Sequence, residues 1–244
     1  MNKINLALMI SQRFYCLNVV LETIKENFKE DYNISVFCNL CKEDFEKYKS
    51  VINFEHIDSF YHFPNENCKM TKKASKWDNH SQKAEFKRKQ PTLLLIDLLQ
   101  KINETLKPED YFIFMEGDVV PIDENVFLSW LSHAKKTNKT LLKNDSKLKT
   151  PKTPAGMCIP GPVYMSAKIA KKLANNLMEI ASVKNVFHSC SYEGVVMAAV
   201  SDPQCNLGNI PGALPNFSIT ERSVDREMMI MSNHNILNLE GRLK

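Results

Sequence analysis

The chain has 244 residues, which fits one large domain or a domain with a small appendage. Hydrophobic residues make up 43% and charged residues 25%, as in ordinary globular proteins. No apolar run approaches the roughly 20 residues of a membrane span, so we expect no transmembrane segment, although peripheral contact with a membrane stays open. The net charge of +4 is modest, and many lysines of the chain gather in two stretches, 69–89 and 135–152. We interpret both as solvated loops and helix faces, and expect no nucleic-acid partner.

The amino-terminal and cysteine patterns favour a cytoplasmic protein. The apolar start is short and soon followed by Arg13, so it reads as a strand rather than a signal peptide. Seven cysteines are an odd count without the dense spacing of a disulfide scaffold, which favours reduced thiols. Cys38-Asn-Leu-Cys41 is a lone C-x-x-C without a second pair, so it does not predict a metal or redox site. The sequence does not predict the oligomeric state.

The amino-terminal half alternates between strand and helix patterns. Apolar runs predict strands, and apolar residues at helical spacing, such as Leu17, Val20, Leu21 and Ile24, predict helices. In chain order we expect a strand at 4–10, a helix at 14–28, a strand at 33–39, a short helix at 43–51 and a third strand within 54–60. A polar, basic excursion follows at 64–90, and Pro91 suits the first position of the next helix.

The carboxyl-terminal half starts from a central strand at 111–115. Asp123 is a plausible N-cap of the helix that follows it, and Ser166 of a helix at 167–180. Between them, the turn at 160–162 should feed a short apolar strand. We further expect a loop at 188–192, a helix at 194–200 headed by Glu193, an irregular tail at 205–217 and a last strand at 228–231.

This alternation predicts an α/β fold with a mostly parallel twisted sheet and helices on its faces. We expect a single domain over residues 1–244. Residues 1–123 would form a Rossmann-like nucleotide-binding half, and residues 124–244 a half that binds an acceptor.

The central strand ends in two acids, Glu116 and Asp118, with Gly117 between them. Carboxylates two apart on an extended backbone point the same way, and a small residue between them leaves room for a ligand. Such a pair suits a hard divalent cation that also binds phosphate oxygens. The alternative is an acidic turn after a core strand. Glycine-rich phosphate loops are absent, so a phosphate site would have to use metal and cations.

Four features, in this order, resemble the GT-A-type glycosyltransferases, which use nucleotide-sugar donors. The first is the amino-terminal β-α-β with its polar turn Ser11-Gln-Arg13. The second is Glu116-Gly-Asp118, which resembles the D-x-D motif with Glu in the first place. The third is 158–173, similar to the acceptor-side strand and helix. The fourth is Tyr192-Glu-Gly-Val-Val196, which resembles the E-D-V segment but has Gly194 in place of its Asp.

The resemblance implies roles for individual residues. Ser11 and Arg13 would contact the nucleotide, and Asp118 would bind Mn²⁺ or Mg²⁺ directly. Glu116 would support Asp118 by holding the metal through water or by bonding the ribose. His234, in a terminal Asn-His-Asn segment, would be a further metal ligand. Its alternative is an ordinary surface histidine.

An inverting transfer also needs a base that takes the proton of the acceptor hydroxyl. The resemblance assigns this role to Glu193, with Asp202 as the fallback. Alternatively, Glu193 has no catalytic role and its negative charge only interacts favourably with the helix dipole.

The predicted function is therefore metal-dependent transfer of a sugar from a nucleoside diphosphate donor, with UDP-sugar as the default, to a saccharide or another hydroxyl acceptor. Three other functions stay open. A nucleotidyltransferase uses similar acids, although Ser11-Gln-Arg13 lacks the glycines of its loop. A non-catalytic protein could bind a sugar nucleotide with the same fold. A nucleic-acid-binding module would use the two lysine-rich stretches.

Overall fold

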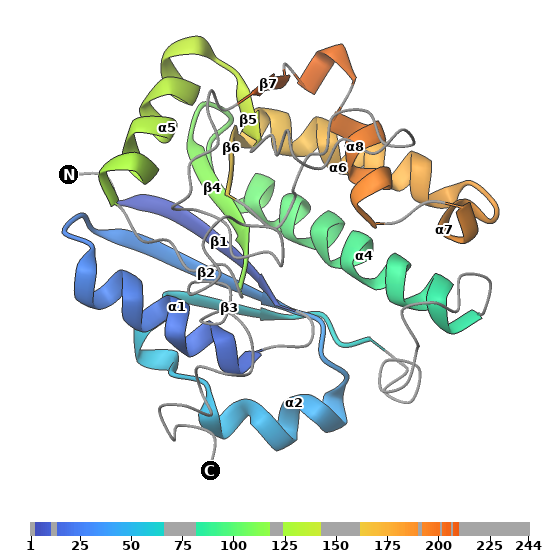
Figure 1. Cartoon of the computed structure of the whole chain (residues 1–244), viewed down its shortest axis with the longest axis horizontal. Helices are drawn as coiled ribbons and strands as arrows, with labels where there is room; N and C mark the ends of the chain where they lie inside the picture. Colours follow the sequence, from blue (N-terminus) through green and yellow to red (C-terminus); the bar gives the residue numbers. More distant parts are fainter. Residues whose placement is uncertain are drawn as a thin grey trace, which may run out of the picture.

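The computed structural model describes residues 3–10, 14–65, 82–117, 124–142, 162–189, 192–200, 202–205 and 207–209. Within these ranges, the chain forms one seven-stranded sheet with the order β3-β2-β1-β4-β6-β5-β7 (Figure 1). Helices cover both of its faces. The prediction of an α/β fold with a mostly parallel sheet is confirmed.

Four neighbouring strands form the parallel part of the sheet. They are β1 (Ile4–Ile10), β2 (Tyr32–Cys38), β3 (Ser59–His62) and β4 (Tyr111–Glu116). β1 pairs in parallel with both β2 and β4, and β2 pairs in parallel with β3. β1 lies between two strands and under helices on both sides, which explains why its sequence is an almost unbroken apolar run.

The other part of the sheet begins where β6 (Val163–Ser166) pairs antiparallel with β4. β5 (Thr140–Leu142) pairs antiparallel with β6, and β7 (Leu207–Asn209) pairs in parallel with β5 at the edge. The direction of the strands therefore changes between β4 and β6.

Two hydrophobic cores lie on opposite faces of the sheet. One face carries α1 (Phe14–Asn27) and α5 (Glu124–Thr137). Their apolar side chains pack against the side chains of β1 and β2 that point to this face. The other carries α4 (Gln82–Thr105), α6 (Ala167–Ser182) and α8 (Tyr192–Val200). Shorter elements complete the described chain: α2 (Lys42–Tyr48), α7 (Val186–Ser189), and the 3-10 turns η1 (Lys49–Val51), η2 (Phe54–His56) and η4 (Pro203–Cys205).

Local sequence signals account for several boundaries. Ser166 is the N-cap of α6 as predicted, because its hydroxyl accepts a hydrogen bond from the backbone N–H of Ile169 at 3.4 Å. The buried residues of α6, such as Ala170, Leu173 and Leu177, recur every three or four positions. This spacing places one face of the helix against the core and leaves the other to solvent.

Other boundaries differ from the expectations. Pro91 lies inside α4 rather than at its first position, since α4 already begins at Gln82. A proline inside a helix lacks one backbone donor, but the leucines that follow it bury the helix against the sheet. The expected third strand at 54–60 begins only at Ser59, because η2 occupies its first residues. The expected loop at 188–192 contains the end of α7 and the start of α8.

The tail also differs, since β7 lies within the stretch expected to be irregular. The expected strand at 228–231 and the expected N-cap at Asp123 fall outside the described residues. Cys38 and Cys205 are free, as expected, and both are buried, which raises the pKa of Cys38 to about 11. Cys41 is disulfide-bonded, so the expectation of reduced thiols is wrong for this residue.

Among the described helices, none combines the length and apolarity that crossing a membrane requires.

Candidate functional site

The order of the strands marks one position at the edge of the sheet. From β1 the chain adds β2 and then β3 on one side, and it then returns through α4 to add β4 on the other side of β1. The connecting helices on the two sides of β1 lie on opposite faces, because α1 connects β1 to β2 on one face and α4 connects β3 to β4 on the other. In open α/β sheets, ligands bind at this point, outside the carboxyl ends of the strands. The candidate site is therefore the carboxyl edge between β1 and β4.

Glu116 lies at this edge as the last residue of β4, beside Met9 of β1. The preceding strand residues are buried, and Glu116 itself is half-buried. Strand side chains alternate, and Phe112 and Phe114 pack in the core under α4. Glu116 therefore projects toward the α4 face of the sheet. The sequence prediction that an acid ends this strand is confirmed.

Gly117 packs closely against β1. Its backbone N–H donates to the carbonyl of Met9 at 2.7 Å, which continues the pairing of β4 with β1. A Cβ at this position would lie 3.3 Å from the Met9 oxygen and 3.4 Å from Cβ of Ile10. The glycine thus allows close packing against β1. The expectation that it also leaves room for a ligand stays a prediction.

The helix that begins with Tyr192 and Glu193 lies on the same face of the sheet. Tyr192, Val195 and Val196 are buried in the core that α8 shares with α4 and α6. Glu193 occupies the first turn of α8, where the helix dipole favours a negative charge. Its side chain, like those of Ser11, Arg13, Asp118 and His234, is not among the described ones.

A cavity of about 460 Å³ opens at the carboxyl ends of β2 and β3. The register connects it with Glu116, because Met9 pairs with Glu116, Ile10 with Cys38, and Cys38 with His62. Its walls come from the residues just after β2 and β3 and from α4. They include Asn39, Phe63, Pro64, Asn65, Gln90, Leu93, Leu94 and Asp97.

Two polar side chains of this cavity were missed by the sequence reading. Asn39 directly follows β2, where the chain leaves the sheet, and yet only 3% of this residue is exposed to solvent. Asp97 is half-buried on α4, and this burial raises the pKa of its carboxyl. The only sequence signal is a polar residue within an otherwise apolar pattern, and that signal does not show which cavity the residue reaches.

Asp202, the fallback base, has a structural role in the described chain. One carboxylate oxygen accepts the backbone N–H of Gln204 at 2.7 Å, and the other accepts Nδ2 of Asn176 at 3.3 Å. These bonds cap η4 and join it to α6. Its two carboxylate oxygens are therefore both engaged by hydrogen bonds within the fold.

Of the three expected metal ligands, Glu116 is the one that lies within the described residues. Glu116 offers the hard carboxylate oxygen that Mn²⁺ or Mg²⁺ prefers. Within the described ranges, no group of three or more His, Cys, Asp or Glu side chains could hold a metal ion. The other two expected ligands, Asp118 and His234, lie outside these ranges, so the ligand set stays a prediction.

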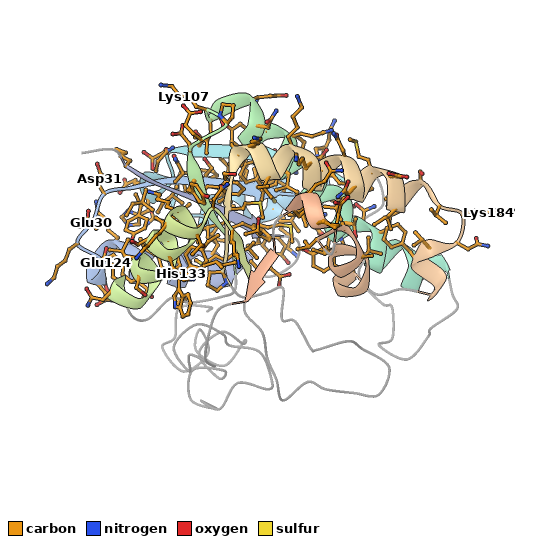
Figure 2. All side chains as sticks on the ribbon, turned by 90° about the horizontal axis from the view of Figure 1, so that it is seen from above. Glu30, Asp31, Lys107, Glu124, His133 and Lys184 are labelled. Carbon is orange, nitrogen blue, oxygen red and sulfur yellow. The ribbon has the colours of Figure 1, made fainter. Side chains whose placement is uncertain are left out.

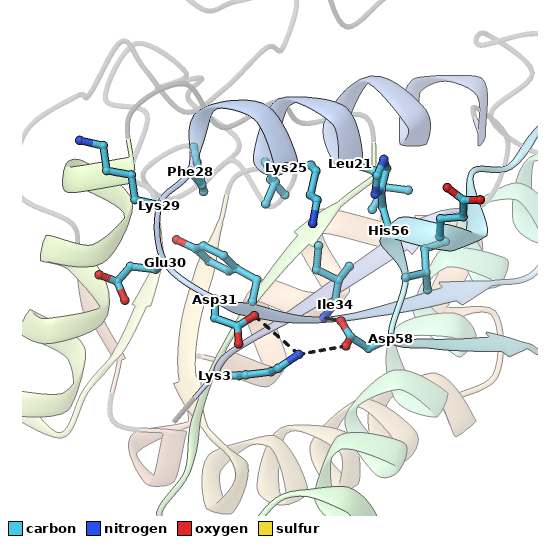
Figure 3. A pocket seen from close by; sticks show the side chains of 14 residues that line it. Lys3, Leu21, Lys25, Phe28, Lys29, Glu30, Asp31, Ile34, His56 and Asp58 are labelled. Carbon is cyan, nitrogen blue, oxygen red and sulfur yellow. Dashed lines mark hydrogen bonds and ion pairs between the residues drawn. The ribbon is translucent and has the colours of Figure 1, made fainter. Parts of the chain in front are cut away.

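A second cavity, of about 420 Å³, lies at the opposite, amino edge of the sheet (Figure 3). Lys3 reaches between Asp31 and Asp58, at 3.6 and 3.4 Å from their carboxylate oxygens. Asp58 also accepts the backbone N–H of Ile34 at 2.8 Å. The charged groups at its centre thus bond one another, and the cavity lies away from the point where the strand order reverses.

Together, the reversal between β1 and β4 and the antiparallel β6 define an α/β fold of the GT-A-like class, as expected. The crystal structure of 4-diphosphocytidyl-2C-methyl-D-erythritol synthase matches with a TM-score of 0.52 and 11% identity, over 95% of this chain and 100% of that chain. At this identity the likeness shows the fold.

Two glycosyltransferase structures are also similar, with lower scores. Apo GlyE of Streptococcus pneumoniae has a TM-score of 0.43 and 10% identity, over 86% of this chain and 45% of that chain. Mouse xyloside xylosyltransferase 1 has a TM-score of 0.41 and 9% identity, over 86% and 85%. No family model and no curated protein matches the sequence.

Proposed function

We propose that the protein is a metal-dependent glycosyltransferase that moves a sugar from a nucleoside diphosphate donor to a hydroxyl acceptor. One observation carries the proposal: β4 ends in Glu116 at the carboxyl edge, where the strand order reverses beside β1. The Glu116-Gly-Asp118 motif therefore begins at the position where open α/β sheets bind ligands. UDP is the default nucleotide.

The chemistry requires charge to be neutralised on the leaving diphosphate. A divalent cation bound there would act as a Lewis acid, with Asp118 as its direct ligand and Glu116 and His234 in support. Ser11 and Arg13 would contact the nucleotide from the loop after β1. Glu193, in the first turn of α8, would take the proton from the acceptor hydroxyl.

The direct test is isothermal titration of UDP, GDP and TDP, with and without Mn²⁺. We expect one nucleotide to bind, and Mn²⁺ to strengthen its binding. Asp118→Ala should abolish the effect of Mn²⁺, and Glu116→Gln should weaken it. Asp31→Ala, an exposed aspartate at the opposite edge, is the control and should bind as wild type does. If no nucleotide binds, or if Asp118→Ala keeps the full effect of Mn²⁺, the proposal is wrong.

A nucleotidyltransferase is the second candidate, because one structure of this kind has a similar fold. The 4-diphosphocytidyl-2C-methyl-D-erythritol synthase matches along its whole length. The product separates the two functions. A glycosyltransferase releases a nucleoside diphosphate from a sugar nucleotide, even slowly with water as acceptor, whereas a nucleotidyltransferase releases pyrophosphate from a nucleoside triphosphate. A protein that binds a sugar nucleotide but forms neither product would be a non-catalytic binder.

A further inference from the structure

One side chain of α6 binds both the end of α8 and the turn that follows it. Nδ2 of Asn176 donates to the backbone carbonyl of Ala199, in the last turn of α8, at 3.2 Å. The same nitrogen donates to a carboxylate oxygen of Asp202 at 3.3 Å, and Sγ of Cys205 lies 3.7 Å from it. The last four carbonyls of a helix have no partner within that helix. Asn176 therefore satisfies one of the groups that α8 leaves open.

The apolar surface of α8 does not by itself fix where the helix lies. α8 packs beside α6 (Figure 1), and apart from Tyr192 its described core side chains are only valines and alanines. Apolar contacts have no preferred direction, so a helix with small side chains slides or turns at less cost than one with large side chains. A hydrogen bond depends on both distance and direction. The bond from Asn176 to Ala199 therefore opposes both movements.

We infer that Asn176 is a positioning residue for the proposed base Glu193, because it fixes α8 along its axis. The inference rests on the proposed function, which assigns the proton of the acceptor hydroxyl to Glu193. Glu193 and Ala199 belong to one short helix, about 9 Å apart along its axis. Such a helix moves as a unit, so a shift at Ala199 also displaces Glu193. A misplacement of about 1 Å can slow a reaction about a hundredfold.

The test measures release of the nucleoside diphosphate from UDP-glucose, GDP-mannose and TDP-glucose, with Mn²⁺ and with water as acceptor. Asn176→Leu nearly keeps the shape of the side chain but removes its N–H donors. We expect it to lower kcat about 10- to 100-fold and to leave KM unchanged, because the base is displaced and the donor site is not. Asn175→Leu, at the exposed neighbouring position on α6, is the matched control and should keep the wild-type kcat.

A double-mutant cycle with Glu193→Gln distinguishes positioning from a merely structural role. Glu193→Gln alone should lower kcat by about 100-fold or more, the usual effect of removing a general base. If Asn176 acts through Glu193, Asn176→Leu should have no further effect in a chain that already carries Glu193→Gln. Effects that multiply fully would show that Asn176 supports the fold in general, and they would overturn the inference.

The outcomes separate this inference from the proposed function. If the wild type releases a nucleoside diphosphate and Asn176→Leu is as active as Asn175→Leu, the inference is wrong and the glycosyltransferase proposal stands. If Glu193→Gln keeps the wild-type kcat, the inference fails together with the assignment of the base. If the wild type releases no nucleoside diphosphate from the three donors, both proposals are wrong. Should Asn176→Leu fail to fold, Asn176→Ala replaces it in the same cycle and is judged by the same outcomes.

Discussion

At the scale of single residues, Gly117 links the acidic strand end to the centre of the sheet. Its N–H donates to the Met9 carbonyl, and a Cβ at this position would be in tight contact with the Met9 oxygen and with Cβ of Ile10. The neighbouring atoms belong to the backbone and to a Cβ, so they have little freedom to move. The position of Glu116 therefore depends on a residue without a side chain.

Gly117→Ala should destabilise the protein by about 1–3 kcal/mol, the usual effect of crowding a packed interior. Gly117→Val should destabilise it further, because its side chain is larger and branched. Urea unfolding followed by circular dichroism measures both effects. An alanine variant as stable as wild type would contradict the close approach of Gly117 to β1.

Asp97 should make stability depend on pH. Burial raises the pKa of its carboxyl in the folded protein above the ordinary value of 3.8. A raised pKa means that its contribution to stability is fully present below that ordinary value and is lost as pH rises through the folded pKa. Asp97→Asn cannot ionise, so its stability relative to wild type should increase from about pH 4 upward and level off once the pH exceeds the raised pKa of Asp97 in the folded protein.

Thermal unfolding of both proteins between pH 3.5 and 7.5 checks this prediction. Asp31→Asn, at an exposed position, should not show the same rise in relative stability. A constant difference between wild type and Asp97→Asn across this range would show that the Asp97 carboxyl ionises as it does in the unfolded chain.

At the scale of elements, one carboxylate joins α5 to the turn before β2. Glu124, in the first turn of α5, accepts the backbone N–H groups of Lys29 and Glu30 at 2.7 and 2.9 Å. It also accepts the hydroxyl of Tyr32 at 3.2 Å. Figure 2 shows Glu124 beside Glu30 at one end of the molecule. Burial, and next the nearby Glu124 carboxylate, raises the pKa of Tyr32.

Glu124→Ala should lower the free energy of unfolding by about 1–3 kcal/mol, because two backbone donors and a half-buried hydroxyl lose their acceptor. Glu124→Gln should have a smaller effect, since it keeps one acceptor oxygen. Glu109→Ala, at an exposed position, serves as the control in chemical denaturation. The role of Glu124 would be refuted by equal stabilities of Glu124→Ala and Glu109→Ala.

The elements with their own strong patterns were predictable from the sequence. β1, β2, β4 and α1 have apolar periodicities that agree with their burial, and α6 adds a capping serine. β5 and β7 have three residues each, so their partners in the sheet rather than their own sequences define them. The sequence placed the start of α4 at Pro91, because proline is common at the first position of a helix. The leucines after Pro91 hold α4 against the sheet, so the helix also extends before the proline.

In the candidate site, too, one part could be predicted from the sequence and another could not. Glu116 follows from a local rule, since an apolar run that ends in an acid marks the end of a buried strand. The cavity around Asn39 does not, because it forms only where the ends of β2 and β3 meet α4. Those segments are far apart in the sequence, and no local pattern shows that they are neighbours.

At the scale of the whole molecule, the strands of the sheet should differ in how strongly they protect their backbone amides from hydrogen exchange. β1 and β4 have a partner on both sides and helices on both faces, whereas β3 and β7 lie at the two edges. All four residues of β3 are partly exposed. Local opening requires the least energy where few buried contacts are lost.

Amide hydrogen exchange followed by mass spectrometry should therefore show the slowest exchange in β1 and β4. Peptides that contain β3 or β7 should exchange markedly faster. Equal protection across all of these strands would mean that the described sheet opens only by global unfolding.

The place of β1 also determines when the sheet can form during synthesis. Asn5 pairs with Asn33 on one side, but with Phe112 on the other. Until the ribosome has released β4, the apolar strand β1 exposes an open edge, and contacts between distant segments form slowly. A fragment that ends before residue 111 would keep that edge permanently, so the nascent amino-terminal half should depend on chaperones until the chain passes Glu116.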